Sequence, residues 1–164
     1  HTPFMDTTPQ DIDDALRINL EHTTYAFQAA SRRLVEQGQG GSMILLSSVV
    51  AQQPFLHTNL TGVSLAAAEV IARMAAVELG PHRIRVNIVS AGWLDDERSE
   101  PLRDPAGELL IDTDIPLGAV GSTRSVGDAC CFLASPRAEY VTGAVLTVDG
   151  GYLLTKSAGR SPYP

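Results

Sequence analysis

The sequence is poor in positive charge and contains a single lysine, Lys156. Its 12 Lys+Arg residues stand against 19 Asp+Glu residues, which gives a formal net charge of −7. So few cations argue against a nucleic-acid partner or binding to an anionic membrane surface. No uninterrupted apolar run reaches the ~20 residues that a membrane-spanning helix needs. We therefore expect neither a nucleic-acid partner nor a membrane segment.

Cysteine is also scarce, and its arrangement is informative. Cys130 and Cys131 are adjacent, and neighbours in sequence cannot easily close a disulfide with each other. They are predicted to be small buried hydrophobic residues. Two thiols with scattered histidines form no metal-ligand pattern, so we expect no metal site. Reduced cysteines favour a cytoplasmic location.

The remaining composition is that of a folded domain. Hydrophobic residues make up 44% of the 164 residues and charged residues 19%, which excludes general disorder and favours one domain. Three strand-like runs follow glycine or proline breakers, and the first and third are short apolar runs typical of strands that are covered on both faces. The predicted strands span about 42–47, 83–89 and 144–149.

Long stretches with helical periodicity separate these runs. Thr8 and Pro9 are typical of a helix start, with Asp11 in the first turn. The predicted helices span about 8–37, about 58–79 and from 122 or 123 to 133. Strands that alternate with helices predict an α/β fold with a parallel sheet.

Two segments are predicted to lie outside this scaffold. Residues 93–121 are polar and proline-rich and long for a connection, which favours a lid or binding loop. Residues 157–164 are typical of a loose tail or an interface arm. The chain as a whole is predicted to be one partial domain over 1–164.

In order and spacing, several motifs resemble the second half of the short-chain dehydrogenase/reductase family. The resemblance covers about residues 3–152 and implies a Rossmann-like, doubly wound parallel sheet with NAD or NADP as cofactor. The motifs that carry it are Pro3-Phe4 with Asn19-Leu20, Leu46-Ser47-Ser48, Ile84-Arg85-Val86-Asn87, Ile115-Pro116-Leu117-Gly118 and Val148-Asp149-Gly150-Gly151.

The family's glycine-rich cofactor-binding start is missing from this chain. The sequence contains no G-x-x-x-G-x-G motif, which in the family holds the cofactor pyrophosphate at a helix N-terminus. Two explanations stay open: a fragment of a longer protein, or a natural half-domain that a partner chain completes. An isolated half-sheet would leave an unpaired edge, which favours the fragment.

The resemblance also assigns the catalytic positions. In the family a tyrosine donates the proton, a lysine four residues later lowers its pKa, and a serine and an asparagine assist. Asn19 and Ser48 match the asparagine and the serine, whereas Thr61 and Leu65 stand at the tyrosine and lysine positions. A threonine hydroxyl has a far higher pKa than a phenol, and leucine offers no charge to lower it. Hydride transfer is therefore expected to be severely impaired.

Weaker candidates surround these positions. Ala91 and Gly92 replace the family's Pro-Gly beside the nicotinamide. His57 could act as an acid or base near neutral pH, although a loop histidine is more often structural. Tyr152 and Lys156 have the spacing Tyr-x-x-x-Lys, but they follow the last strand, and an interface segment is the preferred interpretation.

Three functional hypotheses follow. The leading one is a catalytically deficient subunit that assembles, as a homo- or hetero-oligomer, with an active homologue through the helices at 8–37 and 58–79, with a small-molecule ligand as a further partner. The second is non-redox chemistry (dehydration, cyclisation or isomerisation) through Ser48, His57 and Thr61. The third is an ordinary reductase whose N-terminal part is missing from this chain, or one that uses Tyr152 and Lys156.

Overall fold

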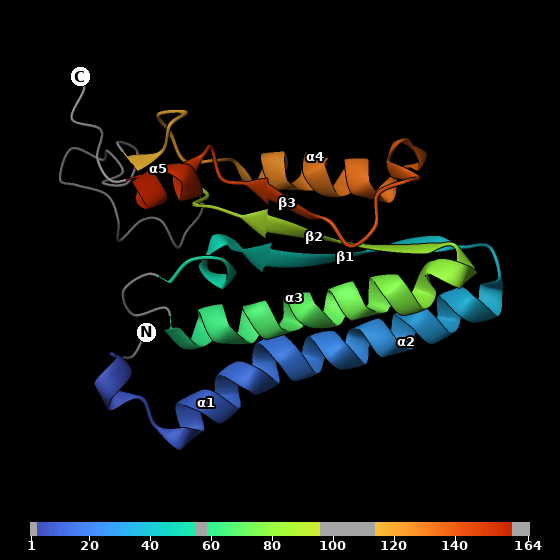
Figure 1. Ribbon diagram of the computed structural model, residues 1–164, viewed down its shortest axis with the longest axis horizontal. Helices are drawn as coiled ribbons and strands as arrows, with labels where there is room; N and C mark the ends of the chain where they lie inside the picture. Colours follow the sequence, from blue (N-terminus) through green and yellow to red (C-terminus); the bar gives the residue numbers. More distant parts are fainter. Residues whose placement is uncertain (1–2, 55–58, 96–113, 159–164) are drawn as a thin grey trace.

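A parallel sheet of three strands organises the chain. The computed structural model describes residues 3–54, 59–95 and 114–158. Within them β1 (Gly41–Ser48), β2 (Ile84–Ala91) and β3 (Val145–Val148) pair in the order β1-β2-β3, all parallel (Figure 1). The predicted α/β fold with a parallel sheet is confirmed. The strand boundaries differ from the predicted ones by one or two residues.

The predicted helix at 8–37 is confirmed, but a π-helical turn interrupts it. A short 3-10 turn η1 (Phe4–Asp6) precedes α1 (Pro9–Leu16), η2 (Arg17–Glu21) is the π-helical turn, and α2 (His22–Gln37) follows. Thr8 and Asp11 form a capping box at the start of α1, which satisfies backbone amides that would otherwise lack partners. Gly38 ends α2 with a left-handed φ of 67°, a conformation that glycine adopts readily.

The two other predicted helices are present, and several short elements that the sequence analysis did not predict accompany them. The predicted helix from 122 or 123 is confirmed, with Ser122 as its N-cap. The predicted start of the second helix, residue 58, lies outside the described residues, and that helix is described from Asn59. The elements are η3 (Val49–Ala51), α3 (Asn59–Leu79), η4 (Gly80–His82), α4 (Thr123–Ala134), η7 (Pro136–Ala138) and α5 (Tyr152–Ala158).

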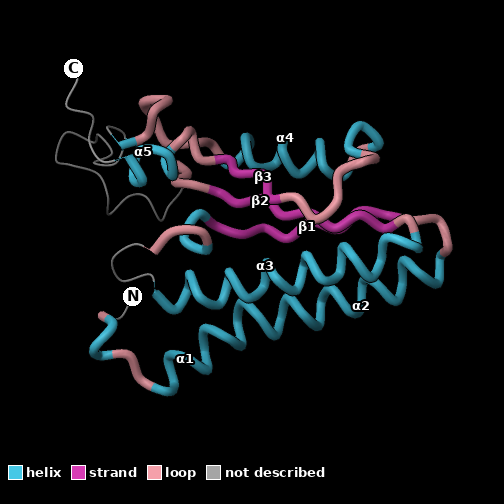
Figure 2. Tube along the Cα trace, in the orientation of Figure 1, coloured by secondary structure: helices cyan, strands magenta, loops and turns pink. Residues whose placement is uncertain are grey.

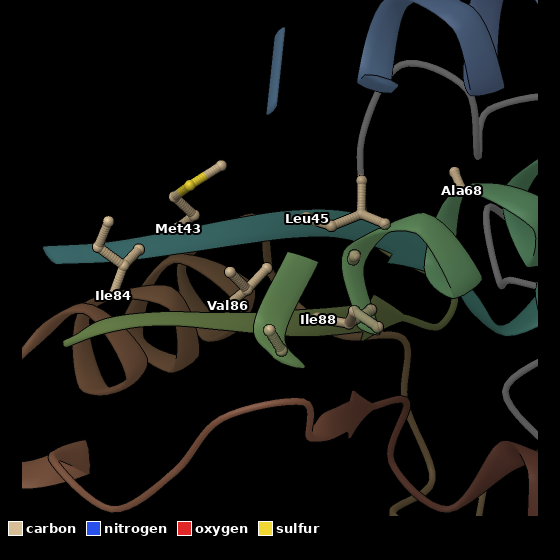
Figure 3. Packing of buried hydrophobic residues seen from close by; sticks show 8 residues of the cluster. Met43, Leu45, Ala68, Ile84, Val86 and Ile88 are labelled. Atoms are coloured by element: carbon tan, nitrogen blue, oxygen red, sulfur yellow. The ribbon is translucent and has the colours of Figure 1, made fainter. Parts of the chain in front are cut away.

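The helices form two layers around the sheet. Helices α2 and α3 lie side by side on one face, and α4 covers the other face (Figures 1 and 2). Side chains of alternate strand residues, among them Met43, Leu45, Val86 and Ile88, pack against the small side chains of α3, including Ala68 (Figure 3). Alanines on α3 let the helix approach the sheet closely, so that the core packs without large side chains from the helix.

A second apolar cluster lies between the sheet and α4. It contains Val89 and Ala91 from β2 with Val126 and Leu133 from α4. Arg85 closes the end of this helix, because its Nη1 donates to the carbonyl oxygen of Leu133 at 2.7 Å. A cation at a helix C-terminus is favourable for the helix dipole.

The cysteine prediction is wrong in part. Cys130 is half-buried and Cys131 is exposed on α4, and both are free thiols. The reason is the helical spacing of about 100° per residue, which turns adjacent side chains to different sides of α4. Burial, together with the neighbouring Cys131, raises the pKa of the Cys130 thiol.

The expectation that no segment is long and apolar enough to span a membrane has to be corrected for one helix. Among the described residues, the helical stretch Leu60–His82 is long and apolar enough to do so by length and composition. In this structure one side of α3 packs on β1 and β2. Core helices of layered α/β domains commonly have this composition, because one face is buried on a sheet.

Of the predicted loop at 93–121, residues 96–113 lie outside the described part. Its two ends meet: Leu94 and Gly121 form a parallel bridge, and the Gly121 amide donates to the Trp93 carbonyl at 2.9 Å. The segment therefore starts and ends beside the carboxyl end of β2. Of the predicted tail at 157–164, only the helical backbone of residues 157 and 158 is described.

Candidate functional site

The predicted catalytic positions lie around the carboxyl end of β1 and the first turns of α3. Ser48 is the last residue of β1, and Thr61 and Leu65 lie one turn apart on α3. Asn19 lies in the π-helical turn η2, which contacts α3. Thr61 is exposed, and the other three are half-buried. In open α/β sheets, ligands bind outside the carboxyl ends of the strands.

Asn19 connects the π-helical turn to α3. Its Nδ2 donates to Ser64 Oγ at 2.9 Å, and Ser64 in turn donates to the Leu60 carbonyl at 2.8 Å. Asn19 therefore lies where the helix is distorted, and its described partner is a side chain. The side-chain bond fixes the turn that carries Thr61 relative to α1 and α2.

Ser48 ends its strand with a weakly held hydroxyl. The Val50 amide donates to Ser48 Oγ at 3.5 Å, which is a long hydrogen bond. This contact caps η3, the short turn that follows β1. The serine hydroxyl is therefore half-buried at the end of the strand and only loosely bound by its own backbone.

Gly92 has a structural reason to be glycine. A Cβ there would lie 2.6 Å from Asp149 Cα, so any side chain would push β2 and β3 apart. The Gly92 amide also donates to the Val148 carbonyl at 2.9 Å. Asp149 accepts from the amides of Gly151 and Leu153 at 2.8 and 2.9 Å, which holds the start of α5.

Tyr152 belongs to the core. It is 3% exposed and packs edge-on against Trp93, with the ring centroids 6.4 Å apart and the planes at 87°. The Tyr152 ring is therefore buried within this chain, whereas the interpretation of residues 152–156 as an interface segment stays a prediction. The side chain of Lys156 and the whole of His57 lie outside the described residues, so the role of His57 stays a prediction.

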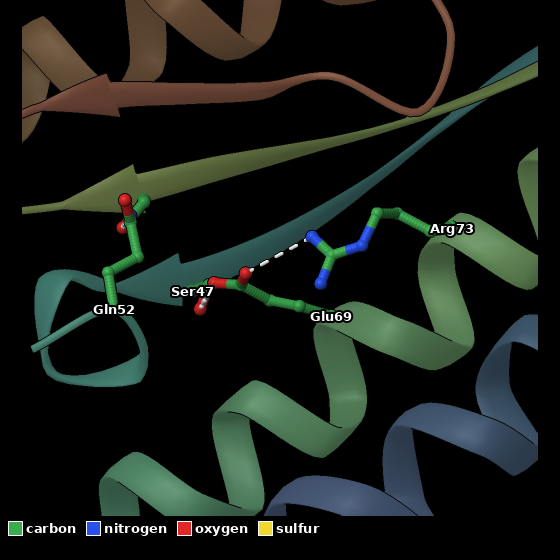
Figure 4. A network of polar contacts seen from close by, with 5 residues as sticks. Ser47, Gln52, Glu69 and Arg73 are labelled. Carbon is green, nitrogen blue, oxygen red and sulfur yellow. Dashed lines mark hydrogen bonds and ion pairs between the residues drawn. The ribbon is translucent and has the colours of Figure 1, made fainter.

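Sequence reasoning missed two polar contacts that link strand ends to neighbouring elements (Figure 4). Ser47 Oγ donates to Glu69 Oε1 at 2.7 Å, and Gln52 Nε2 donates to Ser90 Oγ at 2.8 Å. One signal was available for the first contact: Glu69 is a carboxylate on the sheet-facing side of an alanine-rich helix. The second contact has no such signal, because Gln52 follows the strand in an irregular segment.

A groove of about 280 Å³ lies between η3 and the first turns of α3. Gly62 lines this groove, and a Cβ at this position would lie 2.5 Å from the Val50 carbonyl oxygen. All of the described lining residues are uncharged. They are Val50, Ala51, Gln52, Gln53, Pro54, Gly62, Val63 and Ala66. Within the described residues, no group of three or more His, Cys, Asp or Glu side chains could hold a metal ion.

Comparison with known proteins identifies the family. A family model described as enoyl-(acyl carrier protein) reductase matches residues 1–153. The chain belongs to the short-chain dehydrogenase/reductase family. It is 35% identical over 149 residues to L-rhamnose-1-dehydrogenase of Scheffersomyces stipitis, covering 90% of this chain and 58% of that protein. It is 30% identical over 163 residues to L-xylulose reductase of Mesocricetus auratus, covering 93% and 63%.

A solved structure supports the same fold for this short-chain dehydrogenase/reductase. An Agrobacterium tumefaciens protein described as a 2-deoxy-d-gluconate 3-dehydrogenase, solved with bound NADP, superposes with a TM-score of 0.87 at 27% identity. The match covers 94% of this chain and 63% of that protein. The chain thus spans about 60% of the length of the relatives it matches.

At the two positions that the resemblance assigns to the family's tyrosine and lysine, the residues present do not fit the nicotinamide end of a dinucleotide as the family holds it. Leu65 presents a half-buried hydrocarbon side chain where the family resemblance places a lysine. Thr61, one turn earlier, has only a short hydroxyl in place of a phenol. Neither residue supplies the cation and the acidic hydroxyl that this part of the family site needs.

Proposed function

We propose that this short-chain dehydrogenase/reductase is a catalytically deficient member that serves assembly and ligand binding. The single observation that carries the proposal is the pair Thr61 and Leu65 on the first turns of α3. A phenol needs a nearby cation to act as an acid or base near pH 7. Thr61 has no phenol, and Leu65 has no charge to lower a pKa, so the proton step of hydride transfer lacks its donor.

The proposed assembly surface is an apolar stripe on the outer side of α3. The stripe consists of Val63, Val70, Met74 and Val77, which share one side of the helix and are all at least half exposed. Val77, for example, is 79% exposed. Rows of exposed apolar side chains on one helix face are typical of an interface with another protein. We propose an active homologue as the partner, packed against α2 and α3.

The proposed ligand is a small hydroxylated carbonyl compound. Relatives of this chain are named for L-rhamnose and L-xylulose, and the polar groups at the strand ends, Ser48 and Gln52, are neutral hydrogen-bonding groups. Neutral groups of this kind orient a ligand without attracting ions. The proposal for this chain is therefore binding of the ligand without its reduction.

The catalytic part of the proposal is tested in the natural protein that contains this sequence. We expect no oxidation of NADH or NADPH with L-xylulose above the buffer rate. The double substitution Thr61→Tyr with Leu65→Lys is expected to raise the rate by about 10²-fold or more, since general acid catalysis commonly contributes roughly 10²–10⁴-fold. The matched control is Thr61→Phe with Leu65→Lys, which lacks the phenol hydroxyl.

Two results would contradict the loss of catalysis. One is robust turnover by the unmodified protein that Ser48→Ala abolishes. The other is an equal rate for the tyrosine and phenylalanine double variants, which would show that the phenol hydroxyl is not the missing group. Both results come from the same spectrophotometric assay, which follows the absorbance of the reduced cofactor.

The assembly part has its own experiment. Val77→Glu places a charge in the exposed stripe and is expected to shift the protein to a smaller species in size-exclusion chromatography with light scattering. Tyr140→Glu is the matched control, because Tyr140 is fully exposed after η7 and away from α3. Equal behaviour of the two variants would refute the assembly surface.

A further inference from the structure

Leu65 places a hydrocarbon side chain where the family resemblance implies a charged one. It is half-buried on the first turns of α3, one turn after Thr61. The resemblance also implies that the lysine at this position holds the hydroxyls of the ribose that carries the nicotinamide. An ammonium group has three N–H donors, whereas a leucine side chain has no hydrogen-bonding group. A ribose brought against Leu65 would therefore lose its hydrogen bonds to water without gaining new ones.

The residue directly before Leu65 does not replace the missing donor. Ser64 is fully buried, and its hydroxyl already donates to the Leu60 carbonyl oxygen at 2.8 Å. The same hydroxyl oxygen accepts from Asn19 Nδ2 at 2.9 Å. The Ser64 hydroxyl is thus engaged within the chain, and a ribose could use its proton only if the bond to Leu60 were broken.

The arginine of α3 does not replace the missing cation either. Arg73 is the one cationic residue in the sequence of α3 and lies two turns beyond Leu65. Its Nη1 is 3.5 Å from the Glu69 carboxylate, which also accepts from Ser47 (Figure 4). The charged group one turn after Leu65 is therefore a buried carboxylate, which repels a cofactor that carries negative phosphate groups.

We infer that Leu65 removes binding of the nicotinamide half of the cofactor, in addition to the loss of the proton step. This inference deepens the proposed loss of catalysis and rests on the same helix positions. Any affinity of the natural protein for NADH or NADPH then comes from the adenosine and phosphate half. The nicotinamide and its ribose add no favourable contact to this chain.

Equilibrium titration of the natural protein with NADH and with ADP tests the inference without any substitution. ADP carries the adenosine and both bridging phosphates of NADH but lacks the nicotinamide and its ribose, and NADPH is compared in the same way with its own phosphorylated ADP half. We expect each reduced cofactor and its ADP half to bind with affinities within about twofold of each other. Binding of the reduced cofactor that is tighter than this margin overturns the inference.

A substitution at Leu65 tests the cause. Leu65→Lys supplies the missing cation, and we expect it to raise NADH affinity about tenfold or more, because hydrogen bonds from charged groups are stronger than neutral ones. ADP affinity is expected to stay within about twofold, since ADP lacks the ribose that the lysine would hold. Leu65→Met is the matched control, because it keeps an unbranched hydrocarbon chain without the charge, and both affinities are expected to stay within about twofold. Circular dichroism of each variant checks that the fold is kept.

If the unmodified protein binds neither NADH nor ADP, Leu65→Lys decides the matter. Measurable NADH binding by this variant would support the inference, and its absence would overturn the assignment of the loss to Leu65. Equal gains in Leu65→Lys and Leu65→Met, or a gain for ADP as large as that for NADH, would overturn the role of the charge.

The outcomes distinguish this inference from the proposed function. Tighter binding of NADH than of ADP, without turnover of L-xylulose, overturns the inference and leaves the proposed loss of catalysis intact. Turnover by the unmodified protein overturns both, because hydride transfer requires a bound nicotinamide.

Discussion

Ser47 at the end of β1 donates a hydrogen bond to the buried carboxylate of Glu69 on α3, with 2.7 Å between Oγ and Oε1. The Glu69 side chain is 5% exposed, whereas its second partner Arg73 is 44% exposed and 3.5 Å away. The short hydrogen bond from the neutral Ser47 hydroxyl therefore joins β1 to α3, at the residue directly before Ser48. Arg73 approaches from the rim and contributes a longer contact.

Removal of either partner of this bond is expected to destabilise the protein. Glu69→Ala leaves the buried Ser47 hydroxyl without this acceptor, and we expect the free energy of unfolding to fall by about 1–3 kcal/mol. Glu78→Ala is the control on the same helix, because Glu78 is exposed, and its effect is expected within about 0.5 kcal/mol. Urea unfolding measures both. Equal losses would contradict a specific role for the bond between Ser47 and Glu69.

Two glycines within helices are expected to respond in opposite directions to alanine. Gly62 lies on α3, where a Cβ would be 2.5 Å from the Val50 carbonyl oxygen. Gly62→Ala is therefore expected to cost about 1–3 kcal/mol, since the turn or the helix must shift. On α4, a Cβ at Gly127 would meet no atom within 4 Å, and Gly127→Ala is expected to stabilise by up to about 1 kcal/mol. Thermal unfolding of both variants checks the difference in sign.

The capping box at the start of α1 predicts a stability change in acid. Hydrogen bonds from the Thr8 hydroxyl, at 2.6 Å, and the Thr8 amide, at 2.9 Å, lower the pKa of Asp11. A lowered pKa in the folded state gives stability above the unfolded pKa of about 3.9, and this stability is lost as the pH falls through the lower folded value. Unfolding by urea at a series of acidic pH values is expected to show a smaller pH dependence for Asp11→Asn than for the parent.

The control for this experiment is Asp13→Asn, which removes an exposed charge from the same helix without touching the capping box. The parent and Asp13→Asn are expected to lose stability in parallel as the pH falls. If Asp11→Asn follows the same curve as Asp13→Asn, the capping box does not carry the acid sensitivity assigned to it.

The two cysteines are expected to differ in reactivity. Burial raises the pKa of the Cys130 thiol, and the adjacent Cys131 adds to this shift. Because the thiolate is the reactive form, Cys130 should react with iodoacetamide at a higher pH than an ordinary cysteine, and more slowly than the exposed Cys131. Mass spectrometry of the single-cysteine variants Cys130→Ser and Cys131→Ser measures each rate, and equal rates at every pH would refute this prediction.

The sequence by itself determined the elements and their order. Thr8, Pro9 and Asp11 predict a helix start through local hydrogen bonds, and the start is observed as a capping box. Apolar runs between glycines predict strands within two residues of their observed ends. These signals are local, because caps, turns and side-chain periodicity depend on residues a few positions apart.

The family motifs also placed Ser48, Thr61 and Leu65 around one strand end before any geometry was known. Sequence spacing could place these three residues because the strand, the turn and the helix follow one another directly in the chain. Sequence spacing did not predict the surroundings of Tyr152, because the Tyr-x-x-x-Lys pattern gave no sign that the Tyr152 ring packs on Trp93. A short motif contains no information about which side chains surround it.

Only the tertiary structure decided which polar groups meet. Asn19 and Ser64 are 45 residues apart, Gln52 and Ser90 are 38 apart, and Ser47 and Glu69 are 22 apart. Each pair forms because parallel pairing and helix packing bring distant segments together, and many alternative partners with similar sequence patterns exist along the chain. The sequence therefore determined where the strands end, whereas packing decided that Gln52 donates its hydrogen bond to Ser90.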